Sequence, residues 1–120
     1  MKYILLIHVN PAALEALSEE ERDELLRGHD AFHRAASESG ELVDAVALAD
    51  PANTVTVRVR GGIETATDGP YVEAKEHLAG WYLVDCESRE RAIELAASIP
   101  DARLSALEVR PVMTQGGTEM

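Results

Sequence analysis

The chain is poor in cysteine, in aromatic residues and in positive charge, and each shortage excludes a class of protein. Cys86 is the only cysteine in 120 residues, so an intramolecular disulfide and a thiolate metal cluster are excluded. Aromatic residues make up 4% of the chain, which predicts a core of aliphatic side chains and alanine. The net charge of −11 argues against nucleic acid or an anionic membrane as a partner, because both bind basic surfaces.

Long apolar runs are also absent from the sequence. Residues 1–9 are apolar, but they are too few to cross a membrane, and they lack the basic region and cleavage site of a signal peptide. Apolar residues make up 46% of the chain, which is typical of a folded globular domain. We therefore expect a cytoplasmic protein with one domain over residues 1–113 and a flexible tail over residues 114–120.

Two helices are predicted from capping signals and apolar spacing. The first runs from Ser18 to about residue 39, because Ser18 and Glu21 have the spacing of a capping box and Gly40 ends the pattern. The second starts at Ser88, runs to about residue 98 and is closed by Pro100. The side chains expected to face the core are Leu25, Phe32, Ala35 and Ala36 in the first helix, with Leu26 on its flank, and Ala92, Ile93, Ala96 and Ala97 in the second.

Strands are predicted over residues 2–9, 42–48, 54–60, 63–67, 79–85 and 105–112. Val55, Val57 and Val59 alternate with polar residues, which predicts a half-buried strand, and Gly61-Gly62 is a hairpin turn. The order of elements favours an α+β fold, the ferredoxin-like split βαβ arrangement with an inserted β-hairpin, an antiparallel sheet and two helices on one face. A second copy packed on the other face would cover it, so we expect a homodimer.

One run combines a turn, several charges and a strand. Asp68-Gly69-Pro70 is a turn signal, and it is followed by Glu73, Lys75 and Glu76 beside an apolar strand. The run DGPYVEAKEHLAGWYLVD resembles the signature of the DGPF subgroup of the YCII-related proteins, with tyrosine at position 71 where phenylalanine is usual. The likeness extends from KYILLIH to LEVRPV. It implies a dimeric α/β barrel and a family whose biochemical role is largely unassigned.

His29 is the first candidate for catalysis, because histidine alone has an unperturbed pKa near neutrality. Its spacing from Leu25 and Phe32 places it at or near the buried face of the first helix, where a polar group needs a partner. A satisfied core histidine is the simpler interpretation. The resemblance favours catalysis by His29. Many YCII-related proteins carry a histidine on this helix, and its spacing from the end of the helix matches the spacing from His29 to Gly40.

The other candidates each have a structural alternative. Asp68 is a candidate catalytic group, yet aspartate before Gly-Pro also suits a turn. His8, at the end of the first strand, is a candidate ligand-binding residue or a structural one. Lys75 and Glu76 are candidates for ligand binding or a surface ion pair. Trp81 and Tyr82 point to opposite faces of the sheet. One of them therefore fills the core, and the other lines a cleft or an interface. Trp81 is the candidate for ligand binding.

Other chemistry is not expected. His29-Asp30-Ala31-Phe32-His33 resembles a zinc-protease helix, but aspartate replaces the glutamate base and no third ligand is evident, so we expect no metal site. Phosphate-loop, dinucleotide and serine-hydrolase motifs are missing, and we expect no cofactor. Cys86, at a strand end without a basic neighbour, is expected to be a buried, inert thiol.

Two functions from different classes remain open. The first is a small cofactor-free enzyme with lyase-like acid/base chemistry on a small organic molecule, in which His29 is the base or acid and Asp68 or Glu76 supports it. The second is a non-catalytic ligand-binding or accessory protein, which the resemblance implies because DGPF genes often neighbour sigma-factor genes. A pocket and a carboxylate beside His29 would favour the enzyme, and a backbone carbonyl without a pocket would favour a structural role.

Overall fold

The computed structural model describes residues 1–71 and 74–116, so Glu73 of the charged run and the end of the tail lie outside the described residues. The elements follow in the order β1 (Lys2–Val9), α1 (Pro11–Glu15), α2 (Glu19–Glu38), β2 (Leu42–Ala47), η1 (Pro51–Asn53), β3 (Val55–Arg60), β4 (Ile63–Asp68), β5 (His77–Asp85), α3 (Arg89–Ala97), α4 (Asp101–Leu104) and β6 (Ala106–Pro111). The short helices α1 and α4 were not expected from the sequence.

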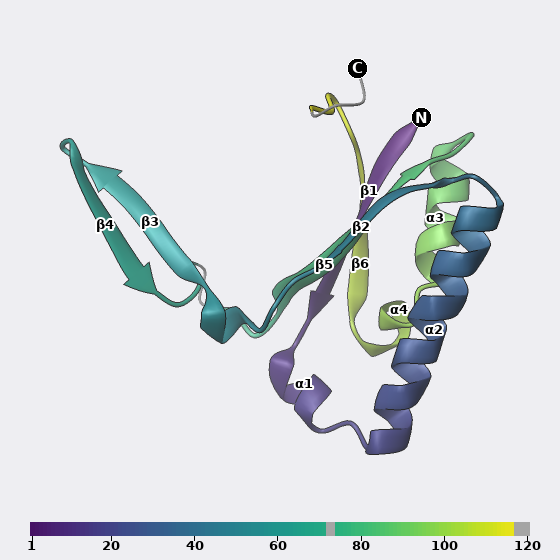
Figure 1. Ribbon diagram of the computed structural model, residues 1–120, viewed down its shortest axis with the longest axis horizontal. Helices are drawn as coiled ribbons and strands as arrows, with labels where there is room; N and C mark the ends of the chain where they lie inside the picture. The colour runs from purple at the N-terminus through teal and green to yellow at the C-terminus, as the bar shows by residue number, and fades with distance from the viewer. Residues whose placement is uncertain (72–73, 117–120) are drawn as a thin grey trace.

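The predicted ferredoxin-like α+β fold is confirmed. Four antiparallel strands form a sheet in the order β2-β5-β1-β6, with α2 and α3 on one face (Figure 1). The predicted hairpin is a separate two-stranded sheet of β3 and β4. The described residues of one chain form an open sheet, not a closed barrel.

The first long helix begins and ends where its sequence signals predict. The Ser18 side chain accepts a hydrogen bond from the Glu21 backbone, and the Glu21 carboxylate accepts one from the Ser18 backbone, which completes the capping box. Gly40 follows the helix with a φ of 77°, a conformation that ends helices and suits glycine. These caps fix which residues of α2 face the sheet, among them Phe32 and Ala36, which are buried.

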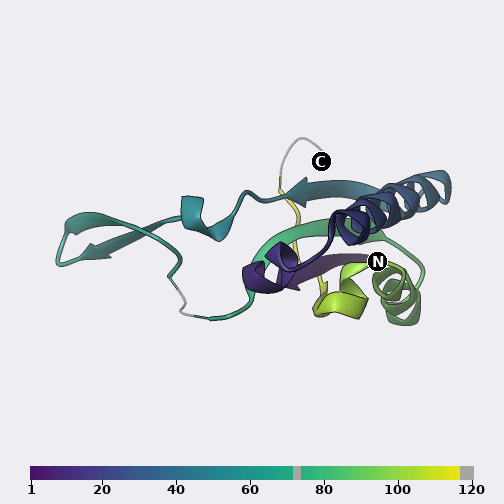
Figure 2. The same ribbon diagram turned by 90° about the horizontal axis from the view of Figure 1, so that it is seen from below.

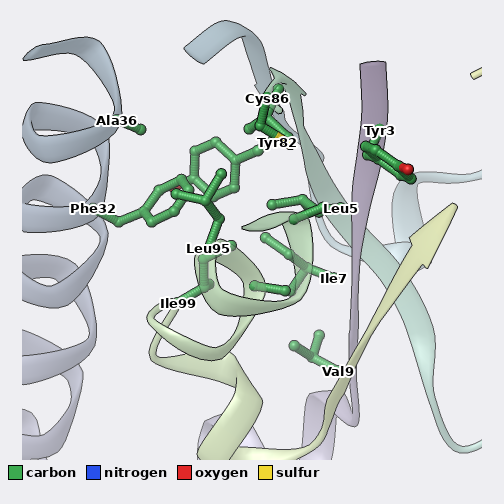
Figure 3. Close-up of a cluster of buried hydrophobic side chains, with 13 residues drawn as sticks. Tyr3, Leu5, Ile7, Val9, Phe32, Ala36, Tyr82, Cys86, Leu95 and Ile99 are labelled. Carbon is green, nitrogen blue, oxygen red and sulfur yellow. The ribbon is translucent and has the colours of Figure 1, made fainter. Parts of the chain in front are cut away.

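The core lies between the sheet and the helices (Figure 3). Alternate residues of β1 point into it, and Leu5 is fully buried. Tyr82 of β5 and Phe32 of α2 pack with ring centroids 4.6 Å apart. The core is aliphatic apart from these two rings and Tyr3, as the composition predicts; its members are Tyr3, Leu5, Ile7, Val9, Phe32, Ala36, Tyr82, Val84, Cys86, Ala92, Leu95, Ala96 and Ile99.

Two of the expected core faces are wrong in detail. In α3, Leu95 is buried, whereas Ile93 is 43% exposed and Ala97 is exposed, because the helix is rotated relative to the expected stripe. Ala35 of α2 is exposed as well. In alanine-rich helices the apolar stripe predicts the buried side poorly, because alanine fits both the buried and the exposed side. The sequence therefore predicts the positions of the helices better than it predicts which of their faces is buried.

The second face of the sheet has no covering helix among the described residues (Figures 1 and 2). We call it the bare face. The strand registers place Ile4, Leu6, Trp81, Leu83 and Val46 on it. Ile4, Leu6 and Trp81 are only half-buried in one chain.

The hairpin of β3 and β4, residues 55–68, projects away from the body, and we call it the arm (Figure 1). Its turn glycines, Gly61 and Gly62, have φ values of 57° and 78°, as a tight hairpin turn requires. The expectation of a half-buried strand is wrong for one chain: Val55, Val57 and Val59 share a face, and all three are exposed. Alternation in a sequence shows which residues share a face and does not show what covers that face.

None of the described helices has the length and apolar character needed to span a lipid bilayer.

Candidate functional site

A pocket of about 420 Å³ lies on the helix-covered side of the sheet, between α2 and the ends of β2 and β5. Its apolar lining is mostly small, with Ala45, Ala47, Ala79 and Gly80 on the sheet side. The polar groups converge from three elements: His29 and His33 from α2, Tyr82 from β5 and Asp101 from α4. An apolar pocket with a few convergent polar groups is the usual form of a small-molecule site.

Close contact between α2 and the start of α4 brings His29 to Asp101. Gly28 faces Pro100, and a Cβ at Gly28 would lie 2.8 Å from the Pro100 ring. Each of these residues directly precedes one of the site residues. The absence of a side chain at Gly28 therefore allows the histidine and the carboxylate, far apart in sequence, to meet.

His29 is held between a carboxylate and a phenol. Its Nε2 lies 2.5 Å from Asp101 Oδ1, and its Nδ1 lies 2.7 Å from Tyr82 Oη. The Asp101 side chain is 6% exposed and the His29 side chain 26% exposed, so the carboxylate is buried behind the imidazole, which reaches the pocket. Among the described residues, no backbone carbonyl is a hydrogen-bond partner of the ring.

The hydrogen bonds assign a direction to the protons. An ionised carboxylate can only accept, so His29 Nε2–H donates to Asp101. In the neutral ring, Nδ1 is then the acceptor, and the Tyr82 hydroxyl donates to it. Burial, with smaller contributions from the charges of Asp101 and Asp30, raises the pKa of Tyr82 to about 12, so the phenol keeps the proton that it donates.

His33 lies one turn after His29, and it lines the same pocket while remaining exposed. The described residues contain no group of three or more histidine, cysteine or carboxylate side chains arranged to hold a metal ion. Cys86 is buried away from this pocket, and burial raises the pKa of its thiol, in keeping with the expected inert cysteine.

The other predicted site residues lie in different places. Trp81 belongs to the lining of the pocket of His29, although the strand register turns its side chain to the bare face. Asp68 ends β4 on the exposed arm, and Lys75 and Glu76 are exposed before β5; none of the three lines that pocket. His8 points to the bare face, where its Nε2 lies 2.5 Å from Glu108 Oε1. The expected cluster of His29 with Asp68 or Glu76 is therefore not brought together.

A second pocket, of about 360 Å³, lies at the root of the arm. Pro70 of the DGPY turn and His77 line it together with residues 48–51, 53, 54 and 78. Its two ionisable residues, Asp50 and His77, make no hydrogen bond to each other among the described contacts, and the Asp50 carboxylate accepts from the Ala52 backbone. This pocket lacks the linked polar groups of the first one.

Sequence patterns did not identify Asp101 or assign Tyr82 to the site. Asp101 follows Pro100 in a segment with no periodicity, and α4 is only 4 residues long. The sequence offers no distinctive signal for Asp101, because several other carboxylates, such as Asp44, Glu94 and Glu108, also stand between apolar residues.

Two comparisons with known proteins cover almost the whole chain. The family model of the YCII-related domain matches residues 1–115. An uncharacterised protein of Rhizobium meliloti (strain 1021) is 33% identical over 114 residues, which cover 93% of this chain and 92% of the relative.

Proposed function

Since the chain belongs to the YCII-related family, whose matched relative carries no assigned activity, we propose a function from the site itself: a small cofactor-free enzyme that moves protons on a small organic molecule. The observation that carries the proposal is the chain of hydrogen bonds from buried Asp101 through His29 to Tyr82 at a pocket. A base oriented by a carboxylate is the arrangement that general base catalysis needs.

The proposed step is lyase-like. A proton leaves a carbon of the ligand for Tyr82 Oη, while the proton of Tyr82 passes to His29 Nδ1. The electron pair left on that carbon forms a double bond to its neighbour, and the leaving group departs from the neighbour with its bonding pair. The resulting imidazolium donates to the Asp101 carboxylate, which stabilises its charge in a buried place. The phenol, with a pKa of about 12, carries the proton and is not itself ionised at neutral pH.

The ligand class follows from the lining. The sheet side of the pocket is formed by small apolar residues, and a volume of about 420 Å³ suits a molecule of modest size. Leu26 and Ile7 add larger apolar surface around it. We therefore propose a compact, largely apolar substrate with an acidic C–H bond.

The test combines soaking and exchange. Crystals are soaked with a cocktail of small C–H acids, and the molecules that bind are incubated with protein in deuterated water. We expect density beside Tyr82 and His29, and exchange of the acidic C–H that falls by about 100-fold or more in His29→Gln and in Tyr82→Phe. His77→Gln, a change outside this pocket, serves as the control.

One result contradicts the enzyme, and another contradicts the proton relay through Tyr82. If bound molecules exchange equally in wild type and His29→Gln, the pocket binds without catalysis, as the accessory role linked to sigma-factor regulation requires. If Tyr82→Phe exchanges normally and only His29→Gln is impaired, His29 acts directly and the phenol is only structural. The motif at residues 68–81 supports a place in the DGPF subgroup, on which the accessory role rests.

The assembly proposed with this function is a cytoplasmic homodimer joined through the bare face. Ile4, Leu6 and Trp81 form a half-buried apolar strip on that face. Apolar sheet faces are normally covered, and a second copy of the same face is the simplest complementary surface.

A further inference from the structure

His33 is a polar side chain of the pocket whose ring nitrogens are not used within the site. Both nitrogens of His29 are engaged by Asp101 and Tyr82, the Tyr82 hydroxyl donates to His29, and the Asp101 carboxylate can only accept. His33 lines the same pocket, and it makes no hydrogen bond or ion pair in the part of the chain that the structure describes. Its ring is therefore free to bind a ligand.

The position of His33 on α2 suits a second contact with the same ligand. Residues four apart on a helix lie on one face, with about 5–6 Å between their Cβ atoms. His29 lies 2.7 Å from the Tyr82 hydroxyl, which accepts the proton of the ligand in the step proposed above. With a contact of about 3 Å at each end, a donor one turn further along reaches an atom two bonds from the carbon that loses the proton.

An oxygen atom at that place in the ligand makes the C–H bond acidic. Loss of the proton leaves an electron pair on carbon, and a carbonyl group beside that carbon takes the pair onto its oxygen as an enolate. A hydrogen-bond donor at the oxygen stabilises the developing charge more than it stabilises the neutral carbonyl, so it lowers the barrier. The His33 ring can donate in either protonation state, because imidazole and imidazolium both carry an N–H.

The charges around the pocket favour a neutral ligand. The carboxylates of Asp101 and Asp30 both act on the Tyr82 hydroxyl and, together with burial, raise its pKa. The described residues that line the pocket include no lysine or arginine. A carboxylate on the ligand would therefore meet like charge without a lysine or arginine beside it, whereas a neutral carbonyl group needs only a donor.

We propose that His33 donates a hydrogen bond to the carbonyl oxygen of a neutral ketone, aldehyde or ester that has a hydrogen on the neighbouring carbon. This rests on the proposed function and names its substrate class. The proton passes to Tyr82 Oη while the proton of Tyr82 passes to His29 Nδ1, and the electron pair moves onto the carbonyl oxygen. When the carbonyl forms again, the pair becomes a double bond to the carbon on the other side, from which the leaving group departs with its bonding pair. His33 keeps its proton throughout.

Two compact C–H acids of similar shape test this role: the ketone indanone and the hydrocarbon indene, of which only indanone offers an oxygen to His33. In deuterated water, we expect His33→Leu to slow the exchange of indanone by about 10-fold or more and to leave the exchange of indene within about two-fold of wild type. His33→Gln keeps an N–H donor and should restore part of the indanone rate. His77→Gln, a change outside this pocket, should alter neither rate.

The carbonyl stretch of bound indanone gives a measure that needs no turnover. A hydrogen bond to the oxygen weakens the C=O bond, so we expect a lower infrared frequency in wild type and in His29→Gln than in His33→Leu. Equal frequencies in wild type and His33→Leu overturn the proposed contact. Equal slowing of both probes in His33→Leu overturns it as well, because a merely structural role would affect them alike.

The same data separate the role of His33 from the enzyme proposed above. If the exchange of indene depends on His29 while indanone fails to bind or ignores His33, the enzyme stands and the carbonyl substrate class is overturned. If the carbonyl frequency of bound indanone is lowered but neither probe exchanges, the enzyme is overturned and His33 is a binding residue only.

Discussion

Tyr82 connects the core to the site. One edge of its ring packs on Phe32 within the core, and its hydroxyl donates to His29 at the pocket. A side chain fixed by packing has little rotational freedom, so the phenol is oriented before any ligand arrives. Orientation of the hydroxyl is thus a consequence of core packing.

The alkaline titration of Tyr82 provides a test of this arrangement. Its pKa is raised from 10.0 to about 12, so the corresponding stability is complete below pH 10 and is lost as the pH rises through 12. In Asp101→Asn, we expect the pKa to fall below 12 and to stay above 10.0, because burial and the charge of Asp30 remain. The tyrosinate signal, followed by NMR or absorbance, measures it.

Asp44→Asn is the control for this titration, because that carboxylate lies on the bare face. An unchanged Tyr82 titration in Asp101→Asn would contradict the described geometry. Tyr3 and Tyr71 titrate in the same spectra, so Tyr82→Phe is needed to assign the signal.

Sequence reasoning identified His29 but not Asp101, and it did not assign Tyr82 to the site. The position of His29 follows from helical spacing, which repeats with the geometry of α2. Asp101 meets His29 only because Gly28 and Pro100 are in contact, and such a contact between distant segments has no local signature. The sequence favours Asp68 or Glu76 as the partner of His29, yet the Asp-Gly-Pro turn that Asp68 begins builds the root of the arm.

At the scale of elements, the approach of α2 to Pro100 sets the geometry of the site. Gly28→Ala would normally stabilise a helix by about 1 kcal/mol. Here the added methyl group meets the rigid Pro100 ring, and overpacking costs about 1–3 kcal/mol. We expect a net loss of about 1 kcal/mol in the free energy of unfolding, measured by denaturant titration, together with weaker exchange catalysis.

Ser37→Ala is the matched control, since it places alanine at an exposed position of the same helix. Ser37→Ala should leave the free energy of unfolding unchanged or slightly raised. A Gly28→Ala protein that is more stable than wild type would mean that α2 and α4 can separate freely.

Elements with strong local signals were predictable, and their surroundings were not. The capping box of α2 and the paired glycines of the hairpin act within a few residues, so they could be recognised directly. The valines of β3 have the same alternation whether their partner is the same chain, another chain or water. Orientation of α3 was missed for a related reason, because its alanines fit either side.

The whole molecule combines a strong negative charge with a partly apolar bare face. Screening by salt weakens repulsion between the two acidic copies, while it leaves apolar contact intact or stronger. We expect the dimer dissociation constant to fall as the ionic strength rises from about 0.05 M to about 0.5 M. Sedimentation equilibrium measures it, and weaker association at high salt would indicate an interface held by ion pairs.

The order of the strands has a consequence for how the protein is made. Within the described residues β1 pairs with β5 and β6 alone, and Lys2 lies opposite Asp85, so this pairing joins segments far apart in the chain. During synthesis, β1 and the valine-rich β3 leave the ribosome well before β5, as exposed strand-forming segments. Long-range pairing of this kind slows folding. We expect the yield of soluble protein to depend on translation speed and chaperone supply more than on the stability of the finished fold.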